Sequence, residues 1–290
     1  MKIVVFDLDE TLGYFTEFGI FWDCLKTYLK QKNPTVHLTQ QDFNALLSLF
    51  PQFLRPNIIN ILKFLKHKKQ SSCCHKMMIY TNNQGPVEWA YFIKTYFEQL
   101  VDFPLFDQIV AAFKVNGKRV EICRTTHDKT HRDFIKCTKL PIHAEICFLD
   151  DALHADMIHD NIYYINLKPY YHDVSFDDML DIFKKSDIDA RGYILDDEEE
   201  ASFIGRPGVL AEEASFIGRL TTFDKIMHTE FKRFKYTCLE KSQAEYEIDV
   251  ILGKQIMTHL HDFFNKSHKS KTRKRSIAAT AARRRKTRRK

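Results

Sequence analysis

The sequence lacks a long apolar run, a secretory segment and a regular cysteine pattern, and each absence excludes a class of protein. No stretch approaches the ~20 apolar residues that a membrane-spanning helix needs, so we expect no membrane partner. The chain begins Met1-Lys2 and enters an apolar run of only four residues, which is too short for the core of a secretory signal. These absences favour a globular intracellular protein.

The seven cysteines are odd in number and scattered, which is typical of a reducing compartment. Cys73, Cys74 and His75, with His67 nearby, fit no reliable zinc spacing. We therefore predict free thiols and no structural zinc site.

The net charge of +6 conceals two parts of opposite sign. Residues 266–290 hold 13 Lys and Arg and no Asp or Glu, whereas the other 265 residues carry 31 basic against 38 acidic side chains. With 44 % hydrophobic residues, among them 24 Phe, the acidic part has ample material for a packed core. The chain therefore combines an acidic globular body with a basic tail.

Apolar runs alternate with segments of helical periodicity through the first 186 residues. Strands are predicted at 3–8, 77–80, 108–113, 119–123, 145–149 and 162–167, and helices at 14–33, 42–50, 55–67, 86–100 and 128–138. Nearly continuous apolar strands alternating with helices indicate a parallel sheet that is covered on both faces. The predicted fold is α/β, a three-layer sandwich around a central, mostly parallel sheet, with a small helical insertion at 14–53.

Three polar clusters follow three of these strands. Asp7 and Asp9 follow the first, Thr81 follows the second, and Asp150 with Asp151 follows a later one. Ligands of parallel sheets bind at the carboxyl ends of the strands, so the clusters should meet at one edge. Carboxylates this close repel each other and need a counter-ion, which predicts a divalent cation.

The four elements of this pattern resemble the motifs of the haloacid dehalogenase superfamily. The first is the DxDxT string at Asp7, Asp9 and Thr11, and the second is the strand that ends at Thr81-Asn82. The third is Lys129 at a predicted helix start, and the fourth is the Asp150-Asp151 pair. The resemblance covers about residues 1–175 and implies that superfamily's Rossmann-like fold.

Three strings resemble the NLI-interacting-factor-like branch, which contains the polymerase C-terminal-domain phosphatases. They are DLDETL at the first motif, Leu54-Arg55-Pro56 and the segment 150–167. That branch carries a β-hairpin flap after the first motif, whereas residues 14–53 here have helical periodicity. This insertion is too short for a large cap, and an open site suits macromolecular substrates.

The resemblance implies a Mg²⁺-dependent phosphatase. Asp7 would be the nucleophile, Asp9 the general acid and base, and Thr81, Asn82 and Lys129 the phosphate-binding groups. The implied metal ligands are Asp7, Asp9 through its backbone carbonyl, Asp150 and Asp151. Lys114 is the rival of Lys129 as the motif lysine, and Lys129 is preferred because a helix start lets its side chain reach over the sheet edge.

The last hundred residues differ in character. We predict an acidic linker at 187–220, a helical extension at 221–265 and a disordered basic tail at 266–290. The linker repeats EEASFIGR at 199–206 and 212–219, either as a local duplication or as a tandem docking peptide. The tail is either a nuclear localisation signal read by an import receptor, a nucleic-acid contact or a solvated terminus.

Three functions compete. The preferred one is a phosphatase acting on phosphoserine or phosphothreonine of a protein. The second keeps the chemistry but takes nucleic-acid ends or small molecules, and the third is a non-catalytic binding protein on the same fold. The expected location is the nucleus or the cytoplasm, with the tail favouring the nucleus, or the virion if the source is viral.

Overall fold

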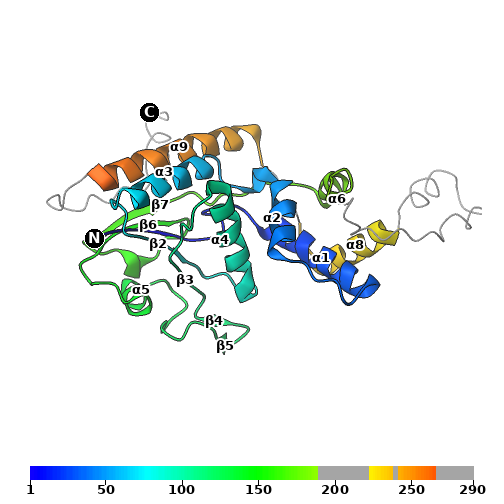
Figure 1. The fold of residues 1–290 in the computed structure, drawn as a ribbon, viewed down its shortest axis with the longest axis horizontal. Coiled ribbons are helices and arrows are strands. Elements are labelled where there is room, and N and C mark those ends of the chain that lie inside the picture. The colour runs from blue at the N-terminus through cyan, green and yellow to red at the C-terminus, as the bar shows by residue number, and fades with distance from the viewer. Residues whose placement is uncertain (189–221, 238–240, 266–290) are drawn as a thin grey trace, which may run out of the picture. The chain divides into compact units, whose positions relative to one another are not determined.

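A five-stranded parallel sheet forms the centre of the computed structural model (Figure 1), which describes residues 1–188, 222–237 and 241–265. The strand order is β3-β2-β1-β6-β7. The bounds are β1 Lys2–Phe6, β2 Lys76–Tyr80, β3 Gln108–Val110, β6 Glu145–Asp150 and β7 Ile162–Asn166. A separate antiparallel hairpin joins β4 (Lys114–Val115) to β5 (Lys118–Arg119).

The strands form where the sequence has its apolar runs. β1 lies between β2 and β6, with Val5 opposite Met78 on one side and Phe148 on the other. All three side chains are fully buried in one hydrophobic cluster. A strand buried on both faces needs a continuous apolar run, which is why β1 shows no alternation of polar residues.

Helices cover both faces of this sheet. α3 (Ile58–Gln70), α4 (Val87–Val101) and α9 (Gln243–Asn265) lie on one face, and α5 (His131–Thr138) lies on the other (Figure 1). The predicted α/β fold is thereby confirmed as a Rossmann-like three-layer sandwich with a parallel central sheet.

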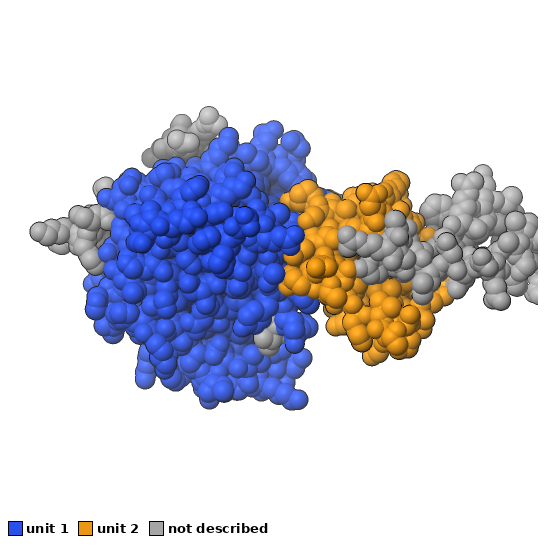
Figure 2. Space-filling view, viewed as in Figure 1, with its two compact units in different colours: residues 1–15, 52–172, 241–290 blue, residues 16–51, 173–240 orange. Residues whose placement is uncertain are grey.

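The chain divides into two compact units (Figure 2). Unit 1 comprises 1–15, 52–172 and 241–290 and contains the sheet, whereas unit 2 comprises 16–51 and 173–240. Unit 2 is helical, with α1 (Thr16–Lys32), α2 (Gln40–Ser48), α6 (Phe176–Lys184) and α8 (Thr222–Arg233). Short 3₁₀ helices occupy Pro51–Phe53 and Ala155–Met157.

The units differ from the predicted domains, which ended the phosphatase domain at 186 and grouped 221–265 as one extension. α8 packs on α1 inside unit 2, whereas α9 packs on α3 and β7 inside unit 1. The insertion at 14–53 is helical as predicted, and α1 and α2 share unit 2 with α6 and α8. Its aromatic face is completed by later helices, as in the edge-to-face pair of Tyr28 and Phe223, whose ring centroids are 4.9 Å apart.

Several predicted strands end earlier than expected, and one helix was missed. β3 ends at Val110, because the backbone of Ala111 bonds to the side chains of Glu121 and Arg124 and leaves the ladder. β5 ends at Arg119. α3 begins at Ile58 because Asn57 has a φ of 67°, in the left-handed region. α6 follows a Ser175 N-cap that was not recognised in the sequence.

The prediction of free thiols throughout is wrong at one pair, because Cys123 and Cys137 form a disulfide. Cys24, Cys73, Cys74 and Cys147 are free. Among the described residues, no helix is both long and apolar enough to cross a membrane. The duplication, most of the acidic linker and the basic tail lie outside the described residues.

Candidate active site

The first two carboxylates lie directly beyond the central strand. β1 ends at Phe6, and the N–H of Asp7 donates to the carbonyl of Leu149 at 2.9 Å, which holds Asp7 beside the end of β6. Only 8 % of Asp7 is exposed. The chain then turns away at Glu10, whose φ of 55° lies in the left-handed region.

Lys129 joins the carboxylates of two motifs. Its Nζ lies 2.5 Å from Oδ1 of Asp7 and 2.7 Å from Oδ2 of Asp150, and the residue is 1 % exposed. It precedes α5, whose N-cap Thr130 accepts a hydrogen bond from the N–H of Asp133. The structure therefore places Lys129 at the carboxylates, whereas Lys114 belongs to the hairpin and lies over the ring of Phe113.

The second motif reaches the carboxylates through Asn83, which sequence reasoning missed. The N–H of Asn83 donates to Oγ1 of Thr81 at 3.0 Å, and its Nδ2 donates to Oδ2 of Asp9 at 2.7 Å. Thr81 is 2 % exposed, and Asn82 turns its side chain toward Arg124. The Thr-Asn-Asn run after a strand is the signal that could have indicated Asn83 as well as Asn82.

Arg124 is a second residue that the sequence did not indicate. It is fully buried, and its guanidinium donates to the carbonyls of Thr81 (3.0 Å) and Ala111 (2.9 Å) and to Oδ1 of Asn82 (2.8 Å). It also donates to the carbonyl of His127 at 2.8 Å. Arg124 thereby connects the loop after β2 to the segment that leads to Lys129. A single arginine in a loop carries no sequence signal for this role.

Three carboxylates lie close enough together to hold one cation. Oxygen atoms of Asp7, Asp150 and Asp151 lie within 4.8 Å of one another. Oγ1 of Thr11 donates to Asp151 at 3.0 Å and orients it. The carboxylate of Asp9 is not part of this set. It accepts a hydrogen bond from Asn83 instead.

The electrostatics follow from burying these charges together. Burial raises the pKa of Asp7 to about 8, with the charges of Asp150 and Asp9 adding to the rise and Lys129 opposing it. Burial also raises the pKa of Asp9 and of Asp151. For Asp150, burial would raise the pKa, but a hydrogen bond from His154 and the charge of Lys129 outweigh it and lower the pKa.

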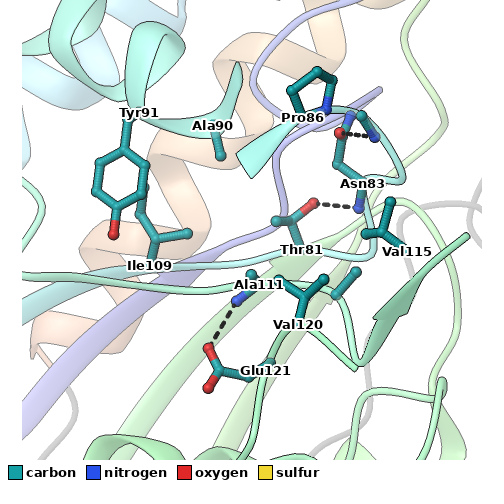
Figure 3. Close-up of a pocket in the computed structure, with 12 residues that line it drawn as sticks. Thr81, Asn83, Pro86, Ala90, Tyr91, Ile109, Ala111, Val115, Val120 and Glu121 are labelled. Carbon is teal, nitrogen blue, oxygen red and sulfur yellow. Dashed lines mark hydrogen bonds between the residues drawn. The ribbon is translucent and has the colours of Figure 1, made fainter. Parts of the chain in front are cut away.

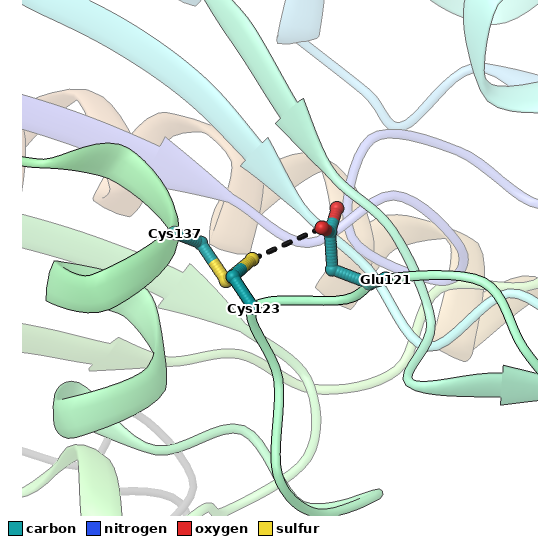
Figure 4. Close-up of side chains that lie close together, drawn as sticks. All are labelled: Glu121, Cys123 and Cys137. Carbon is teal, nitrogen blue, oxygen red and sulfur yellow. Dashed lines mark hydrogen bonds between the residues drawn. A yellow bond between two sulfur atoms is a disulfide. The ribbon is translucent and has the colours of Figure 1, made fainter.

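This donor set fits Mg²⁺. Carboxylate oxygens are the hard ligands that this ion prefers, and Lys129 alone leaves the acidic side chains with excess negative charge. A second cluster, Glu121 with Cys123 and Cys137, does not fit a metal in this form, because the disulfide removes both thiolates (Figure 4). Asp7, Asp150 and Asp151 are therefore the residues that would hold the ion.

Arg55 fixes the loop that follows Asp9. Its Nε donates to the carbonyl of Thr11 at 2.6 Å, and its Nη2 donates to the carbonyls of Glu10 and, at 2.9 Å, Lys168. Gly13 completes the loop, because a Cβ there would lie 2.5 Å from the carbonyl oxygen of Phe53. The Arg-Pro string that resembles the phosphatase branch thus supports the backbone of the first motif.

A pocket of about 150 Å³ adjoins Thr81 and Asn83 (Figure 3). Its other walls come from the start of α4, from β3 and from the hairpin. Most of its lining is apolar, and Glu121 lies at its lower side in this view.

No protein-family model matches the chain, and no curated protein and no solved structure is significantly similar to it. By its fold and site, the protein is an α/β three-layer sandwich. Its acidic site lies at the carboxyl ends of the strands, where Lys129 contacts two carboxylates.

Proposed function

We propose that this chain is a Mg²⁺-dependent phosphomonoester hydrolase of the haloacid dehalogenase type. The observation that carries the proposal is the contact of one buried lysine with the carboxylates of two separate motifs, Asp7 and Asp150. A structural ion pair would need one carboxylate. A buried lysine between two carboxylates, with a third and a fourth close by, suits a site that receives a dianionic phosphoryl group.

The proposed roles are those that the resemblance implies. An oxygen of Asp7 attacks phosphorus while the bond from phosphorus to the ester oxygen breaks, and the leaving oxygen takes a proton from Asp9. Water then attacks the aspartyl-phosphate, Asp9 takes a proton from this water, and phosphate leaves. Asp9 suits the acid and base role because its carboxylate lies outside the cluster of Asp7, Asp150 and Asp151 and is held by Nδ2 of Asn83 at 2.7 Å.

The other residues bind and orient. Lys129 neutralises charge on the nucleophile and on the transferring group, and Thr81 offers its hydroxyl to a phosphoryl oxygen. Asn83 holds the carboxyl group of Asp9 in place. When bound by Asp7, Asp150 and Asp151, Mg²⁺ would supply the positive charge that lets an anionic nucleophile approach an anionic ester.

Hydrolysis of 4-nitrophenyl phosphate with Mg²⁺ tests the activity. We expect Asp7→Asn to lower kcat by at least ~10³-fold, because the nucleophile is lost. Asp156→Asn is the matched control, since it makes the same chemical change at an exposed site in the short 3₁₀ helix Ala155–Met157. Equal rates in wild type and Asp7→Asn would refute the proposal and leave a non-catalytic binding protein on this fold.

For the substrate class we propose phosphoserine and phosphothreonine of proteins, which rests on the DLDETL and Arg-Pro strings. Phosphopeptides and 3′- or 5′-phosphorylated oligonucleotides should be compared using the full chain and a chain without residues 266–290. Peptides are expected to react faster in both. Faster hydrolysis of oligonucleotides that depends on the basic tail would replace this substrate class by nucleic-acid ends.

A further inference from the structure

The pocket beside Thr81 and Asn83 adjoins the acidic site through one residue. Asn83 belongs to both places: its Nδ2 donates to Oδ2 of Asp9 at 2.7 Å, and the residue lines the pocket (Figure 3). Its Oδ1 accepts the N–H of Gly85 at 2.8 Å, which fixes the orientation of the carboxamide. In the proposed reaction Asp9 protonates the leaving oxygen, so the leaving group lies on the side of Asp9 that Asn83 borders.

We propose that this pocket binds the leaving group of the phosphomonoester and selects an apolar group of about the size of one ring that is neutral or positively charged. The inference rests on the proposed function. In a phosphoserine or phosphothreonine peptide the leaving group is the whole peptide, so the pocket receives the side chain of a neighbouring residue, whereas an aryl phosphate places its own ring there. It follows from the size, the lining and the charge of the pocket.

The size and the lining of the pocket indicate that the bound group is apolar and about as large as one ring. A cavity of ~150 Å³ in an engineered protein core accommodates one benzene molecule, and this pocket has a volume of about 150 Å³. Side chains of Ala90, Ile109, Val115 and Val120 supply apolar walls. The ring of Tyr91 stands at the edge and is 52 % exposed, so it can stack on a ring that enters.

The charge of the pocket determines which charge the bound group can carry. Glu121 is the only charged side chain among the described residues that line the pocket, and its Oε2 accepts the N–H of Ala111 at 3.4 Å. A leaving group with its own carboxylate or phosphate would bring a second negative charge beside it, whereas an ammonium or N–H donor would gain an acceptor. Arg119 of the neighbouring hairpin does not line the pocket. Its guanidinium donates to the backbone carbonyls of Ile122 and Arg124.

Three aryl phosphates of similar size test the inference: phenyl phosphate, 4-(aminomethyl)phenyl phosphate and 4-carboxyphenyl phosphate. We expect kcat/KM to be highest for the aminomethyl ester and lowest for the carboxy ester, with about a tenfold ratio between them, the size of effect that one uncompensated charge contact in a partly buried site produces. The uncatalysed hydrolysis rates of the three esters, measured in the same buffer, serve to normalise kcat/KM for differences in intrinsic reactivity.

Two variants distinguish the effect of the charge in the pocket from the effect of charge elsewhere on the surface. Glu121→Gln should reduce the aminomethyl-to-carboxy ratio to about one or two, because the acceptor charge is removed. Glu88→Gln removes the same charge from an exposed position in the first turn of α4 and should keep the wild-type ratio. Thermal melts of both variants should match wild type, since neither side chain belongs to the core.

The outcomes distinguish the two proposals. If wild type hydrolyses none of the three esters, nor acetyl phosphate, the proposed function and this inference both fail. If it hydrolyses them with equal kcat/KM, or prefers the carboxy ester, only the inference is overturned. The inference is also overturned if Glu88→Gln changes the ratio as much as Glu121→Gln does.

Discussion

Lys241 is buried in a cage of aromatic rings at the start of α9. Its Nζ lies 4.6 Å from the ring centroid of Tyr170, 4.7 Å from that of Tyr171 and 4.5 Å from that of Tyr246. Oδ2 of Asp249 lies 2.5 Å away, and the two side chains are 0 % and 1 % exposed. The cage thus couples the last described helix to the loop that follows β7, and we predict that it is a main source of the stability of α9.

The cost of removing the ammonium can be bounded from this geometry. Lys241→Met keeps the length of the side chain and leaves Asp249 as a buried charge, and breaking a buried ion pair in this way costs ~3–5 kcal/mol. Cation–π contacts in desolvated sites add up to ~2 kcal/mol. Lys168, whose Nζ lies 3.5 Å from Oδ1 of Asp249, can compensate for part of the loss. We therefore expect a loss of about 3 kcal/mol in the free energy of unfolding.

Urea unfolding combined with hydrogen exchange of α9 measures this loss. Asp249→Leu in the Lys241→Met background should recover most of the stability, since both charges of the ion pair are then removed. Lys254→Met, an exposed position on the same helix, is the matched control and should change stability by less than ~0.5 kcal/mol. A loss below ~1 kcal/mol for Lys241→Met, or additive losses in the double variant, would refute the reasoning.

Three further changes test other parts of the fold. Gly253→Ala should destabilise by ~1–3 kcal/mol in urea unfolding, despite a better helix former, because its Cβ would lie 2.3 Å from the carbonyl oxygen of Pro56. Cys123→Ser should cost about 3 kcal/mol in the same assay without reductant, since it opens a disulfide with a sequence separation of 14; an unchanged urea midpoint would contradict this. Burial lowers the pKa of His131 below 6.5, so the unfolded chain binds more protons and stability should fall as pH drops through about 6.5. His131→Gln should flatten this part of a pH series of urea midpoints.

The local sequence predicted the edge of the sheet well. Asp7, Thr81 and Asp150 each follow an apolar run, and a run of this kind becomes a buried parallel strand whose carboxyl end has one direction in space. Lys129 was preferred to Lys114 from its position before a helix, and the structure places it at the carboxylates. Such features depend on neighbours in sequence, so patterns of a few residues suffice to predict them.

Contacts between distant segments were not predictable in the same way. Asn83, Arg124 and the partner of Cys123 were missed because each role depends on a group from another loop or helix. The division into units was missed for the same reason. The apolar faces of α1 and α8 indicate that each helix packs on another element, but the sequence does not indicate which one.

The sequence by itself determined the class of fold and the set of acidic, hydroxyl and lysine side chains at its edge, because strand and helix periodicity and strand-end motifs are local. Only the tertiary structure decided that Asn83 joins Asp9 to a pocket, that Arg55 supports the loop after Asp9, and that α9 is held by the Lys241 cage. These depend on charges and donors that are far apart along the chain. Burial brings them together, and each buried charge or donor then requires a specific partner.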